Sequence, residues 1–166
     1  MYADRVTHEN LTHIRLGQNE DLPQLEAILE QSPEAAAWSA EQFAEALASH
    51  PPHLLVAWQG KQIIGFISGR RVADEGEILN LAVRPLSRQQ GIGKALLHEL
   101  LDLFARECVT RVFLEVRQSN DTAISFYRSL QFRQIAQRPN YYRNPAEPAL
   151  VLAKHLHIPG TTAPTN

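Results

Sequence analysis

The sequence predicts an α/β fold in which a mixed sheet of about seven strands carries helices on both faces. The chain has 166 residues, the length of one domain, and is 44% hydrophobic and 20% charged, as in ordinary globular proteins. Strand-like and helix-like apolar patterns follow one another in the order β-α-α-β-β-β-α-β-α-β-β. A strand, a helix and a strand in succession also imply a right-handed crossover between parallel strands.

The first half of the chain contains two predicted helices between strands. "THIRLG" is a predicted strand, and "NEDLPQLEAILEQS" is a predicted helix with Asn19 or Asp21 near its cap and Pro23 in its first turn. A second helix begins at Ser39, which has the capping-box spacing to Gln42. "HLLVAW" and "QIIGFISGR" then predict a hairpin, and "EILNLAV" continues this meander.

The second half alternates helices and strands. The segment after Gly93 carries apolar residues at helical spacing, and "RVFLEVR" follows it as a strand. Asn120 is the predicted cap of the next helix. Two strands, "FRQIAQR" and "ALVLAKHL", close the sheet and are separated by a predicted loop rich in Tyr, Asn and Pro. We expect one domain over residues 1–158 and a flexible tail over residues 159–166.

Charge and cysteine content exclude several classes of protein. The formal net charge of -2 gives no general attraction to nucleic acid or anionic lipid. The single cysteine, Cys108, excludes an internal disulfide, and none of the histidines forms a zinc-binding pattern. "MYADRVTHEN" lacks the apolar core of a signal peptide, and no segment approaches the ~20 apolar residues of a membrane span. We therefore expect a cytoplasmic protein, monomeric or weakly dimeric, without metal, nucleic-acid or membrane partners.

A glycine-bearing loop, "RQQGIGK", stands between a predicted strand and an amphipathic helix. Such a loop exposes N–H groups at the positive end of the helix dipole, where phosphate oxygens bind well. The dinucleotide fingerprint needs a glycine where Leu96 stands, and the nucleotide P-loop needs a glycine and a hydroxyl residue at Arg88 and Ala95. The remaining R-x-x-G-x-G pattern is either an anion-binding loop or a plain strand-to-helix turn.

The stretch "ILNLAVRPLSRQQGIGKALL" resembles the acetyl-CoA loop of the GCN5-related N-acetyltransferase (GNAT) superfamily. Together with "FLEVRQSNDTAISFYRSLQF", "NYY" and "WSAEQF", it resembles the bacterial ribosomal-protein-alanine N-acetyltransferases, the RimI family, over roughly residues 12–155. The resemblance implies the GNAT fold, with the sheet splayed between its fourth and fifth strands, and acetyl-CoA as co-substrate. It implies cofactor contacts at Leu81, Ala82, Val83, Arg88, Gln89, Gln90, Gly91, Ile92, Gly93, Lys94, Asn120 and Tyr127.

Two residues match the catalytic positions of this family. Glu115 lies in the middle of an apolar strand, on the same face as Phe113 and Arg117. It is either paired structurally with an arginine such as Arg117 or, as the resemblance implies, the general base that acts on the amine directly or through water. Tyr127, seven residues after Asn120 and on the same helix face, matches the proton donor to the CoA thiolate, whereas its alternative role is aromatic packing.

The resemblance also implies an acceptor, the N-terminal alanine of a small-subunit ribosomal protein. An α-amine has an ordinary pKa of about 7.7–8, against about 10.4 for lysine, and so needs little help from a base. The acceptor is expected between "SPEAAAWS" and "PNYYRNPAEP", and the candidate substrate contacts are Trp38, Glu77, Tyr141 and Tyr142. The alternative role of the three aromatics is packing, and Glu77 alternatively belongs to a solvated acidic turn with Asp74 and Glu75. The alternatives are acetylation of a small-molecule amine or a lysine side chain, and a non-catalytic acyl-CoA-binding module.

Overall fold

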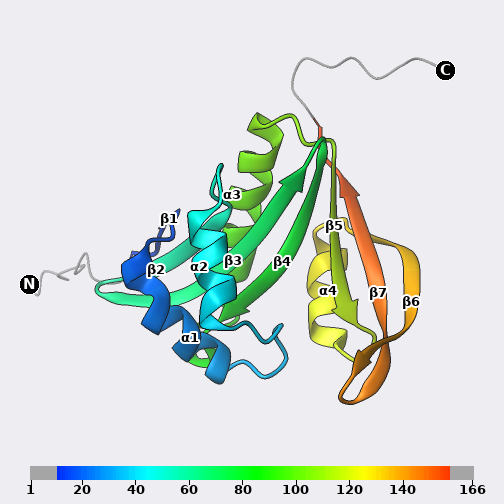
Figure 1. Ribbon diagram of the computed structural model, residues 1–166, viewed down its shortest axis with the longest axis horizontal. Coiled ribbons are helices and arrows are strands. Elements are labelled where there is room, and N and C mark those ends of the chain that lie inside the picture. The colour runs from blue at the N-terminus through cyan, green and yellow to red at the C-terminus, as the bar shows by residue number, and fades with distance from the viewer. Residues whose placement is uncertain (1–10, 158–166) are drawn as a thin grey trace, which may run out of the picture. The chain divides into compact units, whose positions relative to one another are not determined.

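The computed structural model describes residues 11–157, in which strands and helices follow one another in the predicted order (Figure 1). The strands are β1 (His13–Leu16), β2 (Leu54–Gln59), β3 (Gln62–Val72), β4 (Glu75–Val83), β5 (Arg111–Arg117), β6 (Arg133–Arg143) and β7 (Ala146–His155). The α-helices are α1 (Leu22–Glu30), α2 (Ala40–Ala48), α3 (Ile92–Arg106) and α4 (Asp121–Ser129), and the 3-10 turns are η2 (Asn19–Asp21) and η3 (Pro85–Ser87). The sheet has the order β1-β2-β3-β4-β5-β7-β6 and is mixed, because β4 and β5 are parallel and the pairs β1–β2, β2–β3, β5–β7 and β6–β7 are antiparallel.

The described residues divide into two compact units. The first contains residues 11–68 and Asn80–Leu100, and the second contains Gly69–Leu79 and the residues from Leu101 onward. The tail predicted over residues 159–166 lies outside the described residues. Among the helices within residues 11–157, none is long and apolar enough to cross a membrane.

The core of the first unit lies between two helices and the sheet. Amphipathic α1 and α2 direct their apolar stripes at β2 and β3, and Figure 1 shows both helices on the same face of these strands. This cluster contains Leu25, Ile28, Phe43, Leu54, Val56, Ile63, Phe66 and Ala82. From Ile63 to Ser68 of β3 the residues on both faces are buried, and Leu96 of α3 lies against Gly65. Helices therefore cover both faces of the sheet in this unit, as the sequence predicted.

In the second unit, β5 separates an apolar face from a polar one. Val112, Leu114 and Val116 are buried, whereas Phe113, Glu115 and Arg117 alternate with them and are only partly buried. The register between β4 and β5 runs from Glu75 opposite Arg111 to Ile78 opposite Leu114, and both strands continue beyond these pairs. The alternation directs the Glu115 carboxylate away from the apolar face.

The predicted helix caps are present. Ser39 Oγ accepts a hydrogen bond from the backbone N–H of Gln42 (3.3 Å), and Gln42 Oε1 accepts one from the N–H of Ser39 (2.9 Å), which completes the capping box. Asn120 Oδ1 accepts a hydrogen bond from the N–H of Ala123 (3.1 Å) at the start of α4. Asp21 precedes α1 as expected, but its carboxylate binds Arg15 (2.7 and 2.8 Å) and makes no cap bond to α1.

The loop expected between the last two strands is wrong in extent. The structure continues β6 through Tyr141 and Tyr142 to Arg143, and β7 begins at Ala146. The register is irregular between Arg138 and Tyr142, which accommodates Pro139, a residue without an N–H. Composition favoured a loop here, but tyrosines pack well on an exposed edge strand.

Candidate active site

The loop before α3 contains two residues with a left-handed backbone conformation. Gln89 (φ +60°) and Gly91 (φ +80°) are left-handed, so successive N–H groups can converge in a concave nest. The first turn of α3 contains no acidic residue, and Lys94 lies exposed within it. A Cβ atom on Gly91 would meet no heavy atom within 4 Å, so the space beside the backbone is open. The predicted loop Gln89–Lys94 therefore fits a phosphate group.

The other predicted cofactor residues of the first unit lie next to this loop in sequence. Leu81, Ala82 and Val83 end β4, and the side chain of Ala82 is buried in the core, so only main-chain atoms at this position are suited to ligand contacts. Arg88 directs its guanidinium at the segment between α1 and α2, where Nη2 lies 2.6 Å from Glu34 Oε1.

Trp38 lies in the segment between α1 and α2 and is half-buried. Its ring packs edge-on against Phe43, with centroids 5.2 Å apart, and extends the core of the first unit. It also lines an open cavity of about 450 Å³ with residues of this segment and of α1. Trp38 is thus both a packed aromatic and part of the wall of a cavity.

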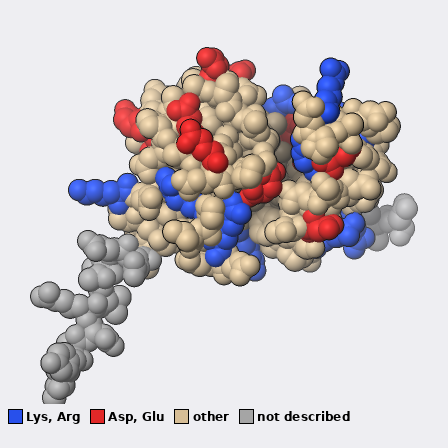
Figure 2. All heavy atoms as spheres, turned by 90° about the horizontal axis from the view of Figure 1, so that it is seen from below, with Lys and Arg blue, Asp and Glu red and all other residues tan. Residues whose placement is uncertain are grey.

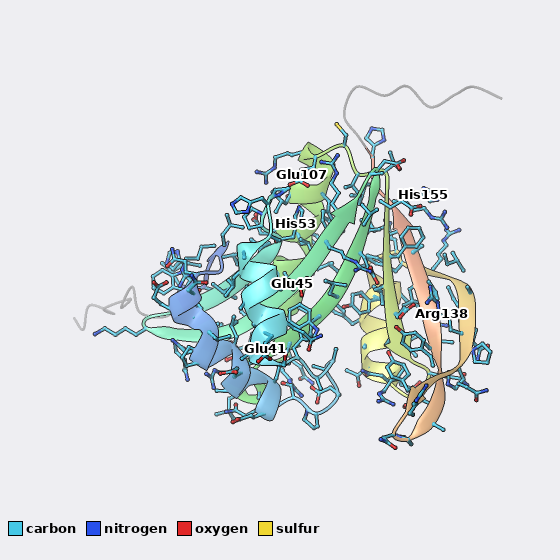
Figure 3. All side chains as sticks on the ribbon, in the orientation of Figure 1. Glu41, Glu45, His53, Glu107, Arg138 and His155 are labelled. Atoms are coloured by element: carbon cyan, nitrogen blue, oxygen red, sulfur yellow. The ribbon has the colours of Figure 1, made fainter. Side chains whose placement is uncertain are left out.

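Glu115 lines an open cavity of about 550 Å³ in the second unit. Its Oε1 lies 3.0 Å from Nε of Arg138 on β6, which is labelled in Figure 3. The Tyr141 hydroxyl donates a hydrogen bond to the same carboxylate, and this bond, more than burial, raises the pKa of Tyr141 to about 12. The side chain of Glu115 is 18% exposed and that of Arg138 60% exposed. The carboxylate is therefore paired with an arginine and also open to a ligand in the cavity.

Glu77 lines the same cavity but is paired with another arginine. Its Oε2 accepts from Nε of Arg70 (2.7 Å) and lies 2.6 Å from Nη2. Three predicted site residues, Glu77, Glu115 and Tyr141, are therefore brought together at one cavity.

Tyr142 has a different environment from its neighbour. The Arg117 guanidinium lies over the Tyr142 ring, 4.0 Å from its centroid, and is held by Glu147 (2.7 Å). Glu147 also accepts a hydrogen bond from the N–H of Ser119 (3.1 Å). Burial raises the pKa of the Tyr142 phenol. These contacts fix the start of β7, and Tyr142 does not line the cavity around Glu115.

Tyr127 is buried on α4, with 7% of its surface exposed. Its ring packs against Phe126 and Phe132, with centroids 5.1 and 5.5 Å away. Burial raises the pKa of its phenol above the ordinary range, so the hydroxyl stays protonated at neutral pH and can donate a hydrogen bond. Asn120, the other predicted residue of this helix, uses its side-chain oxygen as the helix cap.

Sequence reasoning missed Arg138 and Arg70. Arg117, the arginine considered as a partner of Glu115, pairs with Glu147 instead. Arg138 reaches Glu115 because β6 and β7 pair next to β5, where Glu115 lies opposite Val151 and Val151 opposite Ala136. This proximity depends on strand order and on the register of an irregular hairpin, which no local pattern reveals.

Comparison with known proteins agrees with this arrangement. Residues 19–132 match the sequence model of the acetyltransferase (GNAT) family. The [ribosomal protein bS18]-alanine N-acetyltransferase of Escherichia coli (strain K12) is 36% identical over 135 residues, which cover 80% of this chain and 90% of that protein. The chain belongs to the GNAT acetyltransferase family. N-alpha-acetyltransferase RimI of Mycobacterium tuberculosis is 40% identical to this GNAT chain over 110 residues, 64% of this chain and 68% of the relative.

A solved structure supports the assignment of the fold. The crystal structure of the ribosomal-protein-S18-alanine N-acetyltransferase from Escherichia coli has a TM-score of 0.79 and 31% identity, and the match covers 94% of this chain and 99% of that chain. The predicted GNAT fold and the resemblance to ribosomal-protein-alanine N-acetyltransferases are thereby confirmed, and this GNAT protein is an N-acetyltransferase. Within residues 11–157, no group of three or more His, Cys, Asp and Glu side chains is arranged to hold a metal ion.

Proposed function

We propose that this protein transfers the acetyl group of acetyl-CoA to the free N-terminal α-amine of a small-subunit ribosomal protein. The observation that carries the proposal is the Glu115 carboxylate in the wall of an open cavity, on a chain of the GNAT family. The E. coli relative is named for the alanine of ribosomal protein bS18, which makes the corresponding protein the acceptor to test first. With a ribosomal protein as acceptor, the proposed reaction takes place in the cytoplasm.

The first unit supplies the contacts to acetyl-CoA in this proposal. The nest at Gln89 and Gly91, the N-terminus of α3 and Lys94 hold the pyrophosphate. Main-chain groups of Leu81–Val83 pair with the pantetheine amides and polarise the thioester carbonyl. Acetyl-CoA itself supplies an activated acetyl group, and the role of the chain is to orient that group.

The second unit supplies the groups that handle protons. The amine nitrogen forms a bond to the thioester carbon, the carbon–sulfur bond breaks, and the proton of the amine passes to Glu115 directly or through water. Tyr127 donates a hydrogen bond to the departing sulfur and then a proton, which solvent restores. Because burial raises the pKa of Tyr127, the phenol is in its protonated form when the thiolate departs.

In each unit, side chains that line its cavity are the proposed contacts to the acceptor. Tyr141 is 45% exposed beside Glu115, so its ring is available to an incoming peptide. Glu77, paired with Arg70, lines the same cavity, and Trp38 forms a wall of the cavity in the first unit. Tyr142 contributes by fixing the β6–β7 hairpin through Arg117.

The test is the release of CoA from acetyl-CoA in the presence of a hexapeptide that carries the N-terminus of the ribosomal acceptor. We expect turnover with the free peptide and none with its N-terminally blocked twin. Glu115→Gln should lower kcat/KM about 100-fold at pH 7. The loss should shrink at pH 9, because an α-amine with an ordinary pKa of about 7.7–8 is then neutral without a base.

The matched control is Glu99→Gln on the exposed side of α3, which should keep wild-type turnover. Equal turnover of the blocked peptide would overturn α-amine acetylation. Acetylation confined to a polyamine or to a lysine side chain would assign the protein to a different acceptor. Tight acetyl-CoA binding without turnover on any amine would support a non-catalytic role.

A further inference from the structure

Arg88, the leading basic residue of the R-x-x-G-x-G pattern, binds protein groups outside the glycine loop through its side-chain donors. Its Nε donates to the carbonyl of Val83 (3.0 Å), and its Nη2 donates to Ser32 Oγ (3.1 Å). The same Nη2 lies 2.6 Å from Glu34 Oε1. The guanidinium therefore connects the end of β4 to the segment that joins α1 and α2, residues 31–39, which we term the α1–α2 loop.

Asn80 and Arg84, which precede Arg88 by eight and four residues, contact the same loop. Asn80 Nδ2 donates to the carbonyl of Ala36 (2.9 Å), and Asn80 is itself 5% exposed. Arg84 donates through Nε to the carbonyl of Ile63 (2.7 Å) and lies with Nη1 3.5 Å from Gln31 Oε1. Side chains of one continuous segment, from β4 into the glycine loop, thus contact the α1–α2 loop at several points along its length.

The exposed fractions of these side chains indicate whether their contacts stabilise the fold or position the α1–α2 loop. Ser32 is 2% exposed, so its hydroxyl relies on protein partners such as Arg88. The Arg88 and Glu34 side chains are 39% and 45% exposed, and an ion pair so exposed contributes little to folding stability. The contact is better suited to selecting one conformation of the loop. That loop in turn forms the wall of the cavity lined by Trp38.

We propose that Arg88 is a positioning residue for the acceptor side of the site and does not bind the phosphates of acetyl-CoA. Its guanidinium holds the α1–α2 loop through Ser32 and Glu34, while the backbone nest and Lys94 hold the anion. This inference rests on the proposed function, because it takes the α1–α2 loop as a wall of the peptide site. It predicts that a substitution at Arg88 weakens binding of the acceptor peptide more than binding of acetyl-CoA.

The experiment compares Arg88→Gln, Glu34→Gln and Lys94→Gln. For Arg88→Gln we expect an acetyl-CoA Kd within about twofold of wild type by calorimetry, because the nest is untouched. The KM for the peptide should rise about tenfold, the effect of losing one hydrogen bond from a charged group. Lys94→Gln should show the opposite pattern, with a weaker acetyl-CoA Kd and a smaller change in peptide KM.

Glu34→Gln tests the same connection from the other side. It should raise the peptide KM in the same direction, and the double variant should be no worse than Arg88→Gln alone, because both changes remove one interaction. Amide hydrogen exchange in the cofactor-free protein adds a readout that needs no acceptor. Exchange of the α1–α2 loop should accelerate in Arg88→Gln and in Glu34→Gln, and remain at the wild-type rate in Lys94→Gln.

The outcomes separate this inference from the proposed function. An acetyl-CoA Kd that weakens tenfold or more in Arg88→Gln, with unchanged loop exchange, would make Arg88 a phosphate ligand and overturn the inference. If wild-type protein fails to acetylate the peptide, the proposed acceptor is wrong. Acetyl-CoA binding and loop exchange then still decide whether Arg88 holds the loop or the phosphates.

Discussion

Tyr127 shows how one side chain combines packing and chemistry. Its ring is enclosed by Phe126 and Phe132, whereas its hydroxyl is the only part that a phenylalanine would lack. Tyr127→Phe should therefore keep the fold and lower kcat about 10- to 100-fold, because the departing sulfur loses its proton donor. The acetyl-CoA Kd should stay within about twofold, which calorimetry measures beside steady-state turnover. Unchanged turnover would remove the acid role and leave Tyr127 as a packed aromatic.

The position of a single side chain was predictable where strand alternation alone decides it. Glu115 stands in mid-strand, where alternation assigns it to the polar face, and the structure shows it there. Its partner Arg138 was not predictable, because the contact joins β5 to β6, which is two strands away in the sheet and separated from it by β7. Arg88 illustrates the same limit. Its position in the motif indicated phosphate binding, whereas its side chain contacts the α1–α2 loop, which is distant in the sequence.

At the scale of elements, the sequence predicted helix starts well where a nearby side chain accepts a hydrogen bond from the first backbone N–H groups. The capping box at Ser39 and the cap at Asn120 place the starts of α2 and α4 as predicted. The β6–β7 hairpin was predicted less well, because its strands are held together by pairing across an irregular register. Composition around Pro139 indicated a loop, whereas cross-strand pairs such as Tyr142 with Glu147 extend the strands.

Within the second unit, the packing of Phe104, near the end of α3, depends on a glycine in β4. A Cβ atom on Gly76 would lie 2.8 Å from Phe104 Cε2, closer than real Cβ contacts, and Phe104 is fully buried. Gly76→Ala should therefore lower the free energy of unfolding by about 1–3 kcal/mol, the usual effect of overpacking a core. Urea denaturation of the purified variant measures this loss.

A double variant separates overpacking from backbone effects at this position. Phe104→Leu removes the ring atoms that the new methyl group meets, so Gly76→Ala/Phe104→Leu should lose less stability than the sum of the single changes. Strict additivity of the two losses would contradict the proposed contact. It would attribute the effect of Gly76→Ala to the backbone conformation of β4.

At the scale of the whole molecule, charge is distributed without a single dominant sign. The formal net charge is -2, and acidic and basic side chains are interspersed on the face in Figure 2. Each unit nevertheless contains a hydrogen-bonded carboxylate–arginine pair, Asp21 with Arg15 in the first and Glu147 with Arg117 in the second. These local pairs, and not the net charge, should determine how stability responds to acid.

The two carboxylates predict the direction of that response. Burial tends to raise the pKa of Asp21, but hydrogen bonds from Arg15 and from the N–H of Gln18 lower it below its ordinary value. Hydrogen bonds from Arg117 and Ser119 likewise lower the pKa of Glu147. At low pH the unfolded chain therefore binds more protons at these sites than the folded protein does. Their contribution to stability is present above the unfolded pKa values and is lost as the pH falls below about 5.

Asp21→Asn tests this response in the first unit. The variant should be less stable than wild type at pH 7, because Arg15 loses its charged partner, and its stability should fall less steeply between about pH 5 and pH 2. Urea denaturation at a series of pH values measures both effects, and Glu45→Gln on the exposed side of α2 (Figure 3) is the matched control. A slope equal to that of wild type would show that acid acts through other carboxylates. In that case the bond between Arg15 and Asp21 would fix the chain ahead of α1 without making the fold sensitive to acid.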